Sequence, residues 1–83
     1  MPQYWISFRS LTHAQRASRI LERKGFTATL TRLPQGISPK GCGYALILRQ
    51  QPEAALRLIR EAHVQAGLVF EKTKSGDFRE MRL

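Results

Sequence analysis

Hydrophobic side chains recur along this chain either at every second residue, as in a strand, or at helical spacing, and segments of the two kinds follow one another along the sequence. Residues 4–9 (YWISFR) and residues 26–33 (FTATLTRL) alternate apolar and polar side chains, the period-2 pattern of a half-buried strand. Between them, apolar side chains repeat at helical spacing until Gly25, a helix stop signal. We predict that Ser10 or Thr12 caps the start of this helix. The first part of the chain therefore predicts a strand, a helix and a strand.

The second half of the chain repeats this succession. Residues 43–48 (GYALIL) are almost continuously apolar, which is typical of a strand at the centre of a sheet. Pro52 suits the first turn of a helix, and apolar residues then recur at helical spacing until Gly67, which we predict as the end of this helix. Residues 68–72 (LVFEK) predict a further strand.

This order predicts an α+β fold, a ferredoxin-like βαββαβ sandwich whose antiparallel sheet has the strand order 4-1-3-2 and carries two helices on one face. We expect residues 1–72 to form this domain. Residues 73–83 lie beyond the minimal fold and form a C-terminal extension. The turn residues Ser75, Gly76 and Asp77 followed by the alternating FREMRL predict a hairpin with a possible fifth strand. We predict that this extension packs on the sheet or on a partner.

Composition restricts the classes of function. Fourteen Lys and Arg residues against six Asp and Glu give a net charge of +8, which favours anionic partners, although a merely solvated basic surface is the alternative. The longest apolar run is far shorter than the roughly 20 residues that cross a bilayer, so we expect no membrane association. The N-terminal segment lacks the pattern of a secretory signal and one cysteine cannot form an internal disulfide, so we expect a cytoplasmic protein.

The single cysteine, Cys42, lies in a predicted loop between Gly41 and Gly43 and shortly after Lys40. In the predicted fold this loop shares one end of the sheet with the start of the first helix. We therefore expect it to neighbour four residues: Arg9, Ser10, Thr12 and His13. An ordinary thiol, with a pKa of about 8.5, is only about 3% ionised at pH 7, and a helix N-terminus with nearby cations would increase the thiolate fraction. The alternative is that Cys42 is a small apolar residue filling space at the start of a strand.

The chain resembles the family of selenium/sulfur carrier-like proteins, small bacterial domains, over residues 4–70. The marks of the resemblance are Phe8-Arg9-Ser10 followed by Thr12-His13-Ala14, then Pro34, Ile37-Ser38, and the Cys42-Gly43 pair leading into Ala45-Leu46. The loop that runs from Ser38 to Cys42-Gly43 is the most specific of these. A longer loop through Pro39, Lys40 and Gly41, the strong basicity and the C-terminal extension depart from the family pattern.

The resemblance implies that Cys42 holds sulfur or selenium, as a persulfide or selenosulfide, between a donor protein and an acceptor protein. It implies a carrier rather than a turnover catalyst. The supporting residues are then Gly41, Gly43, Lys40, Arg9, Ser10, Thr12, His13 and Ser38.

Two other functions stay open at this point. RNA-recognition domains share the βαββαβ order, and residues 40–47 (KGCGYALI) partly match their third-strand motif. In that interpretation Trp5 and Tyr44 would lie side by side and stack bases, with Lys40 nearby, at roughly 1 to 3 kcal/mol per base. The third possibility is a dimerisation or regulatory module in which the cysteine is incidental.

The predicted sheet leaves an apolar face that needs a cover. If Tyr44 faces away from the helices, so do Leu46 and Leu48, which together with Trp5 form a large apolar patch. Either the C-terminal segment folds over this patch or two copies pair through it, and we predict a homodimer. The covering side chains would be Phe78, Met81 and Leu83.

No metal or cofactor is predicted. One Cys and two His provide no metal-ligand spacing, and the isolated glycines Gly41 and Gly43 make neither a dinucleotide nor a phosphate loop.

Overall fold

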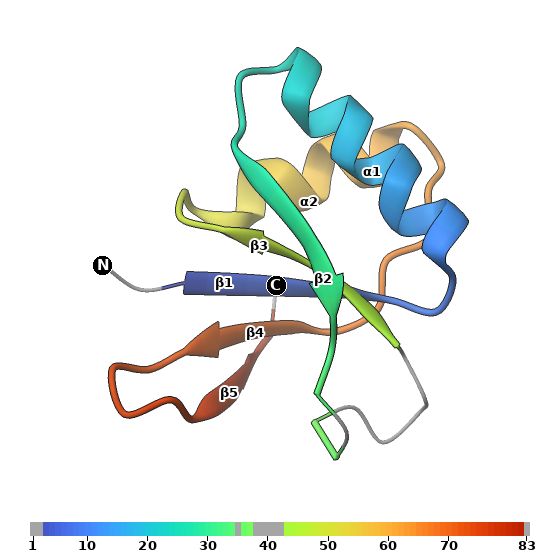
Figure 1. The fold of residues 1–83 in the computed structure, drawn as a ribbon. Coiled ribbons are helices and arrows are strands. Elements are labelled where there is room, and N and C mark those ends of the chain that lie inside the picture. The colour runs from blue at the N-terminus through green and yellow to red at the C-terminus, as the bar shows by residue number, and fades with distance from the viewer. Residues whose placement is uncertain (1–2, 35, 38–42, 83) are drawn as a thin grey trace.

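The computed structural model describes residues 3–34, 36–37 and 43–82 of the chain. The described part forms five strands and two helices, in the order β1 (Gln3–Phe8), α1 (Leu11–Arg23), β2 (Ala28–Arg32), β3 (Tyr44–Leu48), α2 (Pro52–Glu61), β4 (Val69–Lys72) and β5 (Phe78–Met81) (Figure 1).

The strands form a single antiparallel sheet with the order β2-β3-β1-β4-β5. The first four strands stand in the predicted order, so this small α+β structure broadly fits a ferredoxin-like sandwich. β5 pairs with β4, and the predicted C-terminal hairpin is therefore confirmed. Neither described helix is long and apolar enough to span a bilayer.

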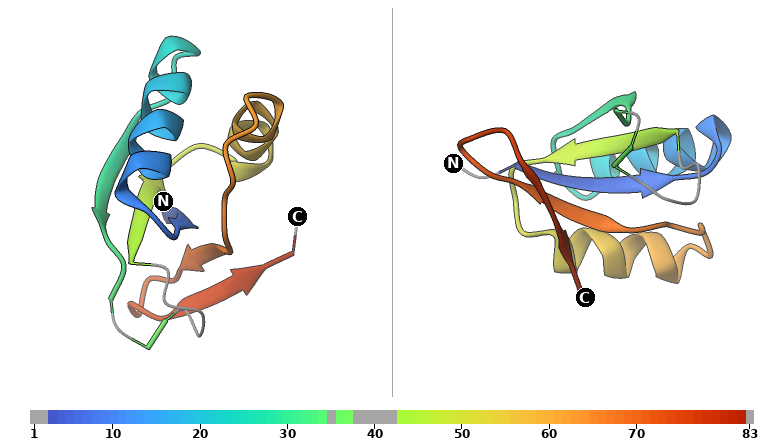
Figure 2. Two further views of the ribbon diagram at one scale, coloured as in Figure 1. Left: turned by 90° about the vertical axis from the view of Figure 1, so that its right-hand side faces the viewer. Right: turned by 90° about the horizontal axis from the view of Figure 1, so that it is seen from below.

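Both helices lie against the same face of the sheet (Figure 2). The core between the layers is apolar, and small residues of both helices let the backbones approach the sheet closely. Its fully buried members include Ile6, Phe8, Leu46 and Leu48 from the sheet, Ala14, Ala17 and Leu21 from α1, and Ala55 and Ile59 from α2.

The strand register shows which side chains face the helices. Phe8 pairs with Tyr44 and Ile6 with Leu46, and directly paired residues point to the same face of a sheet. Tyr44, Leu46 and Leu48 therefore face the helices, so the condition considered above, that Tyr44 faces away from them, is not met. A continuous apolar run such as YALIL does not reveal which alternate residues point to which side.

The opposite face of the sheet carries a second, smaller core. Trp5, Ala45 and Phe70 are buried there, together with Leu33. The Phe78 ring of β5 meets the Trp5 ring edge-on, with 4.9 Å between ring centroids. The C-terminal strand and the segment after β2 thus cover this face within one chain.

Because β5 and the segment after β2 cover the Trp5 face of the sheet, the argument for a homodimer is weaker. Phe78 covers Trp5, which was one of the two alternatives for this face, whereas Met81 packs against the core on the helix side, and Leu83 lies outside the described residues. Since Leu46 and Leu48 are buried, the exposed patch that motivated the homodimer does not exist. Dimerisation stays a prediction.

The two helices end in the same way. After α1, the Phe26 N–H donates to the Leu21 carbonyl and the Gly25 N–H to the Glu22 carbonyl, the Schellman pattern, with Gly25 at φ 86°. After α2 the same two bonds are made by Val64 and His63, and His63 is the one described non-glycine residue with positive φ, at 60°. α2 therefore ends at Glu61, and the prediction that Gly67 ends it was wrong.

Because both Gly25 and His63 have positive φ, we expect that replacing the glycine lowers the stability of the protein and that introducing a glycine raises it. Gly25→Ala is expected to destabilise the protein by about 1 kcal/mol, because the left-handed conformation costs an L-residue about 1 to 2 kcal/mol. His63→Gly is expected to stabilise it by about 0.5 kcal/mol for the converse reason. Urea unfolding of both variants measures the differences. Destabilisation by His63→Gly would show that the imidazole makes a stabilising contact that outweighs the backbone strain.

Candidate functional site

The end of the sheet where β1 stops brings together the described members of the predicted site. Arg9 follows β1 and is exposed. Ser10 caps α1, since its hydroxyl accepts a hydrogen bond of 3.1 Å from the His13 backbone N–H. The first turn of α1 contains no acidic residue, so no carboxylate of its own offsets the positive end of the helix.

The segment between β2 and β3 starts and finishes at this same end. Arg32, the last residue of β2, pairs with Tyr44, the first residue of β3, and Tyr44 also pairs with Phe8. Beyond that pair, the Leu33 N–H donates to the Gly43 carbonyl at 3.0 Å and closes the loop. The Arg32 guanidinium lies 5.7 Å from the centre of the Tyr44 ring, so a cation borders the loop on the β2 side.

Only part of the predicted site falls on described residues. Arg9, Ser10, Thr12, His13 and Gly43 all belong to this end of the sheet. The other predicted members lie outside the described residues; they are Ser38, Lys40, Gly41 and Cys42.

The start of the loop packs away from α1. Leu33 is buried against the second core, and Ile37 packs on that core too. The described start of the loop is therefore anchored on the face of the sheet opposite the helices.

The proposed pair of stacking aromatics does not exist. Trp5 pairs with Ile47 and Tyr44 with Phe8, so the two aromatic side chains point to opposite faces of the sheet. Trp5 is also only 7% exposed. The expectation that Trp5 and Tyr44 lie side by side was wrong, because Phe8, the strand partner of Tyr44, lies three positions after Trp5, and residues an odd number of positions apart on a strand point to opposite faces.

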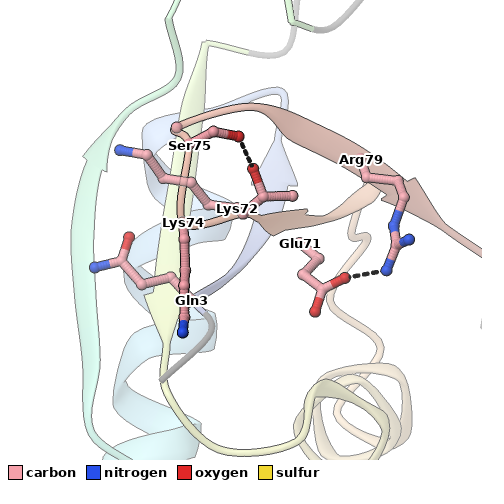
Figure 3. Close-up of a pocket in the computed structure, with 8 residues that line it drawn as sticks. Gln3, Glu71, Lys72, Lys74, Ser75 and Arg79 are labelled. Carbon is pink, nitrogen blue, oxygen red and sulfur yellow. Dashed lines mark hydrogen bonds and ion pairs between the residues drawn. The ribbon is translucent and has the colours of Figure 1, made fainter.

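The structure adds one hollow that the sequence did not indicate. It has a volume of about 650 Å³ at the β4–β5 turn, at the other end of β1 from Arg9 (Figure 3). Arg79 pairs with Glu71, and the Lys72 ammonium lies 5.5 Å from the Trp5 ring centre and 5.6 Å from that of Phe78. Two of its cations are thus engaged by other side chains. A possible signal was the turn sequence TKSGD, which places Lys74 at the rim.

Metal ligation has no support in the described part of the chain. Its His, Asp and Glu residues form no group of three or more that could hold an ion.

Comparison with models of protein families assigns the chain to a family. The model of a family described as "Putative Se/S carrier protein-like" matches residues 3–71. The chain belongs to this family. The match extends from β1 to the third residue of β4 and includes the loop that contains Cys42, whereas β5 lies outside it. A search of curated proteins and a search of solved structures returned no match.

Proposed function

We propose that this protein carries sulfur or selenium on Cys42 between a donor protein and an acceptor protein. The observation that supports this best is the family match over residues 3–71, which contains the chain's single cysteine. The proposed role needs one accessible thiol and no second catalytic residue, which agrees with a chain that has a single thiol and no recognisable triad.

The charges near the loop support a reactive thiol. Gly43, which follows Cys42 in the chain, lies at the end of the sheet that also holds Arg9 and the start of α1. Positive groups favour the thiolate over the thiol, and the thiolate is the nucleophile. Lys40, two residues before Cys42 in sequence, adds a further cation to this segment.

The proposed transfer needs no external oxidant. The Cys42 thiolate attacks the terminal sulfur of a donor persulfide, so that a bond forms between Cys42 Sγ and that sulfur. The sulfur–sulfur bond of the donor breaks, and the donor leaves as a thiolate. An acceptor thiolate then attacks the terminal sulfur and releases the Cys42 thiolate. For selenium the transferred atom is selenium and the intermediate is a selenosulfide.

The expected result of sulfur loading is an all-or-none dependence on Cys42. Incubation with a cysteine desulfurase and its substrate cysteine should add one sulfur atom to the wild type, whereas Cys42→Ser should gain none. Intact-protein mass spectrometry measures the gain, and its removal by dithiothreitol identifies a persulfide.

A displaced thiol provides the matched control. In the double variant Cys42→Ser, Ser75→Cys, the only thiol lies on the exposed β4–β5 turn. If that thiol is loaded as fast as Cys42, any surface thiol suffices and the proposal fails. The pH dependence of iodoacetamide alkylation is a second check, because a Cys42 pKa of about 8.5 or higher would contradict thiolate activation.

A further inference from the structure

Positive charge is concentrated on α1 and its flanks. Residues 9–24 contain one acid, Glu22, and five basic residues, which gives +4 of the chain's +8. The five are Arg9, Arg16, Arg19, Arg23 and Lys24. By contrast, α2 carries both Glu53 and Glu61 beside its arginines.

Three of these arginines share one side of α1. Arg16, Arg19 and Arg23 are spaced i, i+3 and i+7, which places them within about 60° around the helix and along about 10 Å of its length. All three are exposed, and α1 lies on the outside of the molecule (Figure 2). We call these residues the arginine face.

The arginine face has no structural partner in the described part of the chain. The one ion pair there joins Arg79 to Glu71 on the hairpin, far along the sheet from α1. Arg16 and Arg19, and Arg19 and Arg23, are instead like-charge pairs one turn apart, an arrangement that weakens a helix. Folding gives a reason for Arg23, which lies in the last turn of α1 where a cation interacts favourably with the helix C-terminus. It gives none for adding Arg16 and Arg19 to the same side of the helix, whereas an anionic partner does.

The surroundings of the arginine face point to phosphates rather than to an acidic protein. A protein partner would need apolar or aromatic anchors at the centre of the contact. The other exposed residues of α1 are polar except Leu11, which is 40% exposed and lies at the first position of the helix. A nucleic-acid duplex needs no such anchor, because counterion release from regularly spaced phosphates supplies the affinity.

We propose that the arginine face of α1 binds the phosphate backbone of a nucleic-acid duplex without reading its sequence. This function is independent of the proposed carrier role, since it uses neither Cys42 nor its loop. It also differs from base stacking by Trp5 and Tyr44, which the register excludes. Arginine suits this role because its planar guanidinium matches phosphate oxygens in pairs.

The test compares two triple variants that remove the same charge. The first is Arg16→Gln, Arg19→Gln, Arg23→Gln. The matched control is Lys74→Gln, Arg79→Gln, Arg82→Gln, whose exposed cations lie on the β4–β5 hairpin at the other edge of the sheet. The arginine-face variant keeps good helix formers, and the loss of two repulsive pairs offsets the lost interaction of Arg23 with the helix C-terminus, so its thermal midpoint should change little.

Fluorescence anisotropy with a labelled DNA duplex of about 20 base pairs measures binding between about 50 and 200 mM salt. For three lost phosphate contacts, the slope of log affinity against log salt should become less steep by about 2.7 units in the first variant. The wild type should accordingly lose about 40-fold more affinity than this variant over that range of salt. The control should change the slope by less than about 1 unit, and a duplex of unrelated sequence should bind equally well.

Several outcomes would overturn the proposal. These are no binding by the wild type at about 50 mM salt, an equal loss in both triple variants, or a strong preference for one duplex sequence. Displacement of the duplex by polyglutamate at equal charge concentration would indicate an acidic protein partner instead. Cys42→Ser should bind like the wild type, so a failed carrier role leaves this test intact.

Discussion

Replacing Trp5 with alanine is expected to remove about 3 to 5 kcal/mol of stability, enough to unfold much of the population of a small domain. Trp5 is the largest side chain of the second core and is only 7% exposed. Its neighbours come from distant parts of the chain: Leu33 from the segment after β2 and Phe78 from β5. Phe78 is held by β5 and Leu33 by its backbone hydrogen bond to Gly43, so these neighbours cannot collapse fully into the space that Trp5 leaves. Urea unfolding followed by far-UV circular dichroism measures the loss.

A variant of the covering ring separates loss of the cover from loss of the tryptophan itself. Phe78→Ala removes the edge-on contact to Trp5 but leaves Trp5 in place, so we expect a smaller loss than for Trp5→Ala. Since the chain has one tryptophan, its fluorescence reports this site alone. The emission of Phe78→Ala should shift to longer wavelength as water reaches the ring. An unshifted spectrum would mean that β5 is not the cover of this face.

Replacing Ser7 with alanine is expected to cost about 1 to 3 kcal/mol, although it removes a single oxygen atom. Ser7 is fully buried near the end of β1. The pairing with β4 is irregular here, because the Ser7 N–H donates to the Leu68 carbonyl while the Ser7 carbonyl accepts from Gly67. This bulge-like pairing leaves the Leu68 N–H without a backbone acceptor, and the Ser7 hydroxyl accepts from it at 2.7 Å. Alanine would leave this N–H unpaired.

The location of the effect distinguishes this cause from general destabilisation. Hydrogen exchange at the Leu68 amide should accelerate in Ser7→Ala more than exchange at the amides of β3. Ser75→Ala is the control, because Ser75 is exposed on the β4–β5 turn, and we expect it to change stability by less than about 0.5 kcal/mol. Uniform acceleration throughout the sheet would show that the Ser7 hydroxyl has no special role at Leu68.

The irregularity at Ser7 illustrates what sequence patterns miss. The apolar alternation of residues 4–9 correctly predicted β1, and it assigned Ser7 to the side of Trp5, away from the helix-facing Ile6 and Phe8. Nothing in the pattern indicated that this polar side chain is completely buried. Its burial depends on Gly67 and Leu68, about sixty residues away, which provide the hydrogen-bond partners.

For the candidate site, too, the sequence predicted some features correctly and missed others. The sequence located the end of the sheet shared by Arg9, Ser10 and the borders of the β2–β3 loop, because the order of strands and helices fixes which ends lie together. It could not assign faces within YALIL, where nearly every residue is apolar, and so it wrongly placed Trp5 beside Tyr44. The arginine face was present in the spacing of Arg16, Arg19 and Arg23. It could be interpreted as a binding surface only after the structure showed that Arg16, Arg19 and Arg23 are exposed.

The sequence by itself determined the succession of strands and helices, the glycine stop after α1 and the C-terminal hairpin, because these depend on hydrophobic period and on the backbone freedom of neighbouring residues. Only the tertiary structure decided that α2 ends at Glu61 with His63 in the left-handed position after it, that Phe78 and Leu33 close the second core over Trp5, and that Leu46 and Leu48 face the helices. These features depend on strand register and on contacts between distant segments, and local patterns carry no information about either.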